Sequence, residues 1–197
     1  MKTRISLSLL ALVLVLSPSC KNSPTQISEV PSMEFPNNIG NSWTYSHFDS
    51  LAQKSDSVLV TIVGQTNLTP DQVATIWQFK YPNRIDTGYV TVSQDTVRLV
   101  SSGRSFRILF PLQVGNKWVE DYVNDTNRVV GYGPITVVAG SFSGAYQIVE
   151  SWGGFNDYGS IARWFVPAVG IVRMYHRGWS FGEANETYEL IRYQIIQ

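Results

Sequence analysis

Residues 73–81 read VATIWQFKY, and this run decides how the chain folds. Every second residue is apolar, aromatic or β-branched: Val73, Thr75, Trp77, Phe79 and Tyr81. Because side chains alternate between the two faces of a β-strand, this spacing predicts one strand with a single buried face. The same period of two recurs from Gly40 to the end of the chain, and turn-forming residues interrupt it at short intervals. The pattern predicts antiparallel β structure and no helix.

The other predicted strands surround this one. Trp43, Tyr45 and His47 share one face of the first strand, and further strands are expected at residues 56–66, 84–92, 96–100, 105–110, 117–123, 128–139, 145–152, 161–166, 170–176 and 186–196. Short loops join them. We therefore predict one all-β domain, an antiparallel meander of about a dozen strands. The pattern does not distinguish between a curved sheet, a half-barrel and a sandwich. The run at residues 58–63 is apolar at consecutive positions, which suggests a central strand covered on both faces.

Composition excludes several classes of protein. The chain has 197 residues with 15 basic and 15 acidic side chains, 15% charged and 13% aromatic residues. No cluster of Lys and Arg is present that would release counterions from nucleic-acid phosphates, so nucleic-acid binding is not expected. The many aromatic and few charged residues are not typical of disorder or of a coiled coil. No apolar run is long enough for a spanning helix.

The amino terminus reads MKTRISLSLLALVLVLSPSC. Basic residues precede a short apolar segment and then small residues before Cys20, which is typical of a secretory signal. Cys20 is the single cysteine of the chain, and its position resembles the lipobox of bacterial lipoproteins. Ser17 stands where that motif usually has Leu. We predict a signal peptide at residues 1–19, cleaved before a lipidated Cys20; the alternative is a secreted protein with an unmodified Cys20.

A polar, proline-containing segment follows the cysteine. Residues 20–34 show neither helical nor strand periodicity, so we predict a flexible tether that joins the lipid anchor to the β domain at residues 35–197. In lipoprotein sorting, Asp directly after the cysteine favours the inner membrane. Lys21 occupies that place, so the sequence predicts an outer-membrane anchor and leaves its face, periplasmic or outer, open.

One motif occurs twice. FPNNIGNSW at residues 35–43 and FPLQVGNKW at residues 110–118 match at Phe, Pro, Gly, Asn and Trp, and FVPAVG at residues 165–170 is a weaker copy. Proline ends a strand, glycine permits a tight turn and tryptophan anchors the next strand. We interpret the motif as a corner at which a strand begins; the alternative is a repeated binding surface.

Three segments together resemble a group of uncharacterised bacterial envelope lipoproteins. These are the FPxxxGNxW motif, TVVAGSF at residues 136–142 and WFVPAVGIVR at residues 164–173. In that group, a stretch like VPAGxF is followed by one like WYAPGVGLVK. This chain departs from the pattern at Val138, Ala168 and Arg173. The resemblance implies an envelope location and a β fold, and it implies no particular activity.

The sequence holds little catalytic chemistry. His47 and His176 are the chain's two histidines, which argues against a metal site, and we interpret both as surface residues, with a His47–Asp49 pair on one strand face as the alternative. We predict no catalytic residue, metal or cofactor. The carboxylate pairs that could serve a hydrolase are Glu120–Asp121, Glu150–Asp157 and Glu183–Glu186. We expect these to be solvated charges, the last two pairs in loops.

Aromatic residues in Gly-rich segments are the remaining candidates for ligand binding: Trp152, Phe155, Tyr158 and Trp179. Such loops stack on sugar rings or peptide edges, although the same rings would also cap the open end of a core. We therefore predict a non-catalytic binding or assembly module of the envelope, held to the membrane by its lipid, with an envelope protein or a glycan as ligand. The alternative is an envelope hydrolase that uses loop carboxylates on glycan or peptide.

Overall fold

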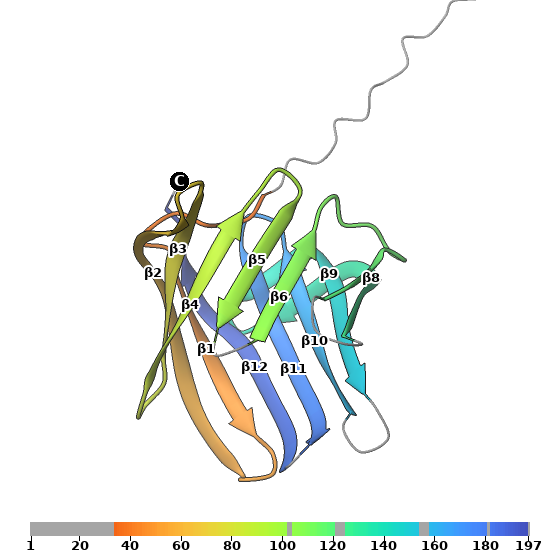
Figure 1. The fold of residues 1–197 in the computed structure, drawn as a ribbon. Helices are drawn as coiled ribbons and strands as arrows, with labels where there is room; N and C mark the ends of the chain where they lie inside the picture. Colours follow the sequence, from red (N-terminus) through yellow and green to blue (C-terminus); the bar gives the residue numbers. More distant parts are fainter. Residues whose placement is uncertain (1–33, 102–103, 121–124, 154–157, 181, 197) are drawn as a thin grey trace, which may run out of the picture.

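The computed structural model describes residues 34–101, 104–120, 125–153, 158–180 and 182–196, which form one strongly curved sheet (Figure 1). The strands are β1 (Ser42–Asp49), β2 (Lys54–Thr69), β3 (Gln72–Lys80), β4 (Ile85–Val92), β5 (Thr96–Ser101), β6 (Arg104–Leu109), β7 (Lys117–Val119), β8 (Thr126–Val137), β9 (Gly140–Gly153), β10 (Tyr158–Val166), β11 (Gly170–Ser180) and β12 (Gly182–Gln194). All twelve are antiparallel to their neighbours, which confirms the predicted all-β meander. No helix in the described ranges has the length and hydropathy to span a membrane.

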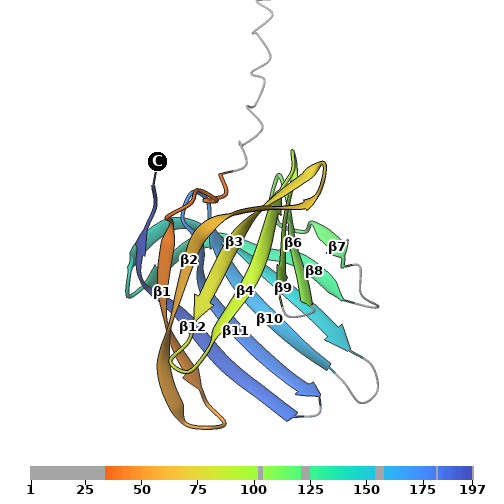
Figure 2. The same cartoon turned by 60° about the vertical axis from the view of Figure 1, so that its left-hand side comes forward.

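The strand order closes the sheet almost into a barrel. It runs β6-β5-β4-β3-β2-β1-β12-β11-β10-β9-β8-β7, so the first and last strands of the chain pair in the middle of the sheet. The two free edges, β6 and β7, are consecutive in sequence, and Figure 2 shows β6 returning to the side of β7 and β8. One sheet therefore encloses its own core, and the sandwich alternative is wrong.

A buried carboxylate joins the two edges. Glu120, directly after β7, is 1% exposed and accepts hydrogen bonds from the backbone N–H and the Nε of Arg107 on β6, both at 3.0 Å. Asn127 Nδ2 at 2.8 Å and Trp118 Nε1 at 3.3 Å donate to the same carboxylate. The expectation of a solvated charge at Glu120 is therefore wrong. Its side chain is buried between β6 and β7, and it connects these two strands where no backbone hydrogen bonds pair them.

The outer face of β2 is exposed to solvent. Val58, Val60 and Ile62 of this strand are buried, while Leu59 and Val63 are 37% and 44% exposed. The prediction that residues 58–63 form a strand covered on both faces is therefore wrong. A single closed sheet buries only its concave side, and apolar residues on the convex side stay in contact with solvent.

The two full copies of the repeated motif have the same hydrogen bonds. Gly40 and Gly115 adopt φ of 93° and 98°, a left-handed conformation that favours glycine. Each glycine N–H donates to a carbonyl across the sheet, Gly40 to Ile62 and Gly115 to Val129, both at 2.8 Å. The following asparagine N–H closes a turn three residues back in both copies. The interpretation as a corner that starts a strand is confirmed.

Candidate functional site

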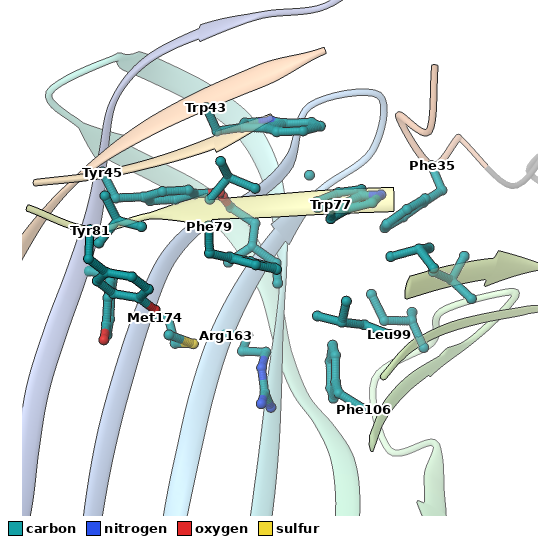
Figure 3. Close-up of a pocket in the computed structure, with 18 residues that line it drawn as sticks. Phe35, Trp43, Tyr45, Trp77, Phe79, Tyr81, Leu99, Phe106, Arg163 and Met174 are labelled. Carbon is teal, nitrogen blue, oxygen red and sulfur yellow. The ribbon is translucent and has the colours of Figure 1, made fainter. Parts of the chain in front are cut away.

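The concave side of the sheet contains a partly open cavity of about 230 Å³. Its walls come from β1 to β6 on one side and from β10 to β12 on the other, and Figure 3 shows the side chains that surround it. Most of them are aromatic or aliphatic, among them Tyr45, Phe79, Leu99, Phe106, Met174 and Tyr188. Engineered apolar cavities of about 150 Å³ already admit benzene, so this cavity is large enough for an organic ligand.

A stack of aromatic rings closes one end of the cavity. Trp43 and Trp77 lie parallel with centroids 5.0 Å apart, Phe35 stacks 6.0 Å from Trp77, and Phe165 lies 6.1 Å from Phe35. The indole N–H of Trp43 donates to the carbonyl of Val169 at 2.6 Å. The first motif copy therefore supplies both a corner and, through Phe35 and Trp43, part of the cavity wall.

Asp56, His47, Tyr188, Met174 and Arg163 follow one another across the inner face in one row. The strand register places Asp56 of β2 opposite His47 of β1, His47 opposite Tyr188 of β12, Tyr188 opposite Met174 of β11, and Met174 opposite Arg163 of β10. The row begins with a His–Asp contact and ends with a guanidinium beside the cavity. Tyr188 and Met174, between them, line the cavity directly.

Arg163 is the one charged residue among the described residues that line the cavity. Its Nη1 lies 2.6 Å from Oε2 of Glu150 on β9, and the two side chains are 9% and 8% exposed. The guanidinium carbon lies 3.8 Å from the ring centroid of Phe106, so the cation also packs on an aromatic face. Figure 3 shows this side chain between Met174 and Phe106.

The two histidines meet at Glu186. His47 Nδ1 lies 2.8 Å from Asp56 Oδ1 and its Nε2 lies 3.8 Å from Glu186 Oε1, while His176 Nδ1 lies 3.3 Å from Glu186 Oε2. The hydrogen bond with His176 is the main cause that lowers the pKa of Glu186, and burial opposes it. Tyr188 stacks on His47 at 4.5 Å; burial, and secondarily the Glu186 charge, raise the pKa of its hydroxyl.

These positions correct two interpretations of the sequence. The histidines are not surface residues, because each lies mostly buried on the inner face against a carboxylate. His47 pairs with Asp56 rather than with Asp49, whose carboxylate instead accepts the backbone N–H groups of Leu51 and Ala52 in the turn after β1. Hydrogen bonds from those two groups lower the pKa of Asp49.

The carboxylates are not the solvated loop charges that we expected. Glu150 and Glu186 lie on β9 and β12, inside the strands predicted at residues 145–152 and 186–196. Each faces a basic side chain, Arg163 and His176 respectively. Asp121 and Asp157 lie outside the described residues. Within the described ranges, no group of three or more His, Cys, Asp or Glu is placed to hold a metal ion.

The structure places the predicted aromatic ligand residues on strands. Trp152 lies one residue before the end of β9, and its side chain is on the inner face. Its ring packs against Gly159 and lies 5.9 Å from the ring of His176. Tyr158, 57% exposed, begins β10 one position before Gly159 and therefore on the opposite face. The backbone of Trp179 pairs with Tyr158. Phe155 lies outside the described residues, as do Cys20 and most of the predicted tether.

The cavity and Arg163 were missed by sequence reasoning. A signal for Arg163 existed, because Ile161, Arg163 and Phe165 alternate on β10 and an arginine between two apolar residues must share their buried face. The cavity itself had no sequence signal, since all its walls read as ordinary core positions. Chemically, the described lining is apolar apart from Arg163, and the nearby Glu150 and Glu186 each face a basic side chain.

Comparisons with known proteins extend the description of the fold. Neither the family models nor the curated protein sequences yield a match. Two solved structures are similar: a candidate lipoprotein from Parabacteroides distasonis ATCC 8503, with a TM-score of 0.51, and a candidate exported protein with a YmcC-like fold from Bacteroides fragilis NCTC 9343, with a TM-score of 0.56. Each is 13% identical, and each alignment covers 83% of this chain and 99% of the other. The chain thus shares its fold with proteins described as lipoprotein and exported protein.

Proposed function

We propose that this protein is a bacterial envelope lipoprotein whose β domain binds a ligand with an apolar part in the cavity. The cavity carries the proposal, because an apolar concavity with few polar groups is the usual form of a small-molecule site. The signal sequence and Cys20 support the envelope location, and so does the fold shared with a candidate lipoprotein. We further propose a lipid anchor in the outer membrane, and membership of the lipoprotein group that shares the FPxxxGNxW motif.

Filling the cavity tests its role in binding. The probe is N-phenyl-1-naphthylamine, an uncharged dye whose fluorescence increases in apolar surroundings. Leu99 lines the cavity from β5, whereas Val100, the next residue, points to the outer face and is exposed. We expect Leu99→Trp to weaken binding of the dye by about tenfold, because the indole occupies the ligand's space, and Val100→Trp to leave binding unchanged. Equal binding by both variants would refute the cavity as the site.

Lipidation is tested separately on the full chain expressed in a bacterial envelope. We expect the wild type to partition into detergent and to show the mass of acylated Cys20, and Cys20→Ser to move to the aqueous phase. An unmodified, water-soluble wild type would contradict the anchor. Fractionation of inner and outer membranes would then test the location.

A second class of ligand belongs to the same proposal of a non-catalytic module. An envelope protein or a glycan is a second class of ligand, and exposed Tyr158 is the residue through which it would bind. The hydrolase alternative has less support, because Glu120, Glu150 and Glu186 each lie within ion-pair distance of a basic side chain.

A further inference from the structure

A buried ion pair lies at the wall of the cavity, and its cation, Arg163, lines the cavity. Arg163 and Glu150 are both more than nine-tenths buried. Removing two charges from water costs more than their attraction usually returns, and apolar residues of similar volume often replace such pairs without loss of stability. The pair is therefore better explained by what the guanidinium does on the side that faces the cavity.

The chemistry of arginine restricts what it can meet there. A guanidinium has five N–H donors and no acceptor, and it stays charged at all physiological pH values. Phe106 packs on its face, so Arg163 is fixed between an aromatic ring and the Glu150 carboxylate. A ligand atom that lies against Arg163 favourably must therefore be a hydrogen-bond acceptor, and a cationic group would be repelled.

The walls restrict the rest of the ligand. Phe79, Leu99 and Met174 are among the apolar side chains around the same space. At about 230 Å³ the cavity is about one and a half times the size of the 150 Å³ apolar cavity that admits benzene, and it is partly open, so the end of a longer chain can extend out of it. This size fits one acyl chain of medium length rather than a two-chain lipid.

We propose that the cavity binds a single acyl chain and that Arg163 receives the carboxylate or carbonyl oxygen at its polar end. This inference rests on the proposed function, since it names the ligand class of the same cavity. Glu150 is a positioning residue that holds the guanidinium in place. It also balances the charge of Arg163 when the cavity holds no ligand.

Three ligands of equal chain length test the inference: decanoate, 1-decanol and decylamine, each competing with N-phenyl-1-naphthylamine at pH 7. We expect decanoate to bind about tenfold more tightly than decylamine. This ratio of affinities corresponds to the free energy of one hydrogen bond to a charged group. The double variant Arg163→Met with Glu150→Gln removes both charges, so neither is left buried without its partner. In this variant we expect the preference for decanoate to disappear. The affinity for decanol should stay within about twofold of wild type.

The outer face offers a matched control. Arg173 and Glu189 form a pair 3.5 Å apart on β11 and β12, with side chains 33% and 29% exposed, so Arg173→Met with Glu189→Gln makes the same two substitutions away from the cavity. This control should keep the preference for decanoate. The comparison of the three ligands on the wild type requires no variant, so it remains decisive if the cavity variant does not fold.

The outcomes distinguish the two proposals. If wild type binds all three ligands equally, or prefers decylamine, the role of Arg163 is refuted while the cavity remains a binding site. Retention of the preference in the cavity double variant also refutes it. If none of the ligands displaces the dye and the dye itself does not bind, the proposed function fails.

Discussion

Replacing Glu120 by alanine tests how the sheet closes. The Glu120 carboxylate connects edge strands β6 and β7 and accepts four hydrogen bonds, two from Arg107 and one each from Trp118 and Asn127. The substitution should therefore weaken the fold specifically at the junction of the two edges.

The expected cost follows from these contacts. Removing one partner of a buried ion pair costs about 3 to 5 kcal/mol, because the remaining charge and donors stay desolvated. Arg107 is one-fifth exposed and regains some water, so about 4 kcal/mol is expected for Glu120→Ala. Glu120→Gln keeps one acceptor oxygen and should cost about half as much.

Urea unfolding followed by circular dichroism measures this cost directly. For a domain of this size, about 4 kcal/mol also lowers the melting temperature by roughly 8 to 16 °C. Glu189→Ala is the control, because Glu189 forms a partly exposed pair with Arg173 that should contribute no more than about 1 kcal/mol. If Glu120→Ala unfolds at the same urea concentration as Glu189→Ala, the carboxylate does not hold the edges together.

Three more predictions concern stability. The pKa of Glu186 is lowered in the folded protein, so its ionised form stabilises the fold at pH values above its ordinary value of 4.5, and this contribution is lost as the pH falls through the lowered pKa. Urea midpoints between pH 3 and 7 should therefore fall less steeply on acidification in Glu186→Gln than in wild type. Gly115→Ala should cost about 1 to 2 kcal/mol because of its positive φ, whereas Gly133→Ala, also with open space at Cβ but without positive φ, should stay within about 0.5 kcal/mol of wild type. Trp152→Ala should cost about 2 kcal/mol in urea unfolding, since the indole packs against Gly159.

Clear results would contradict these three expectations. An identical pH dependence in Glu186→Gln and wild type would show that this carboxylate does not contribute through its ionisation. Equal stabilities of the Gly115 and Gly133 variants would show that the corner imposes no strain on alanine. A Trp152→Ala variant as stable as wild type would leave Trp152 as a candidate ligand residue only.

Much of the fold was predictable because strand patterning is a local property. The predicted strand at residues 73–81 corresponds to β3, and the predicted corner at Phe35 to Trp43 precedes β1. Strand ends were less accurate: Trp179 was placed in a loop, yet its backbone belongs to β11. Hydrogen bonds from both neighbouring strands stabilise this segment, and those partners cannot be seen in its own sequence.

The site was less predictable because it depends on register between distant strands. His47 and His176 read as unrelated residues, and only the pairing of β1 with β12 and β12 with β11 brings both to Glu186. In the same way, Glu150 reads as a surface charge until β9 pairs with β10 and places it beside Arg163.

The sequence by itself determined the strand class and the corners, because alternation and the placement of glycine and proline act over a few positions; the export signal before Cys20 stays a prediction of the same local kind. Only the tertiary structure decided that one sheet closes on itself, that Glu120 joins its edges, and that Arg163 faces an apolar cavity. The physical reason is that closure and register arise from contacts between strands far apart in the chain, and an unfilled space between side chains has no pattern of its own in the sequence.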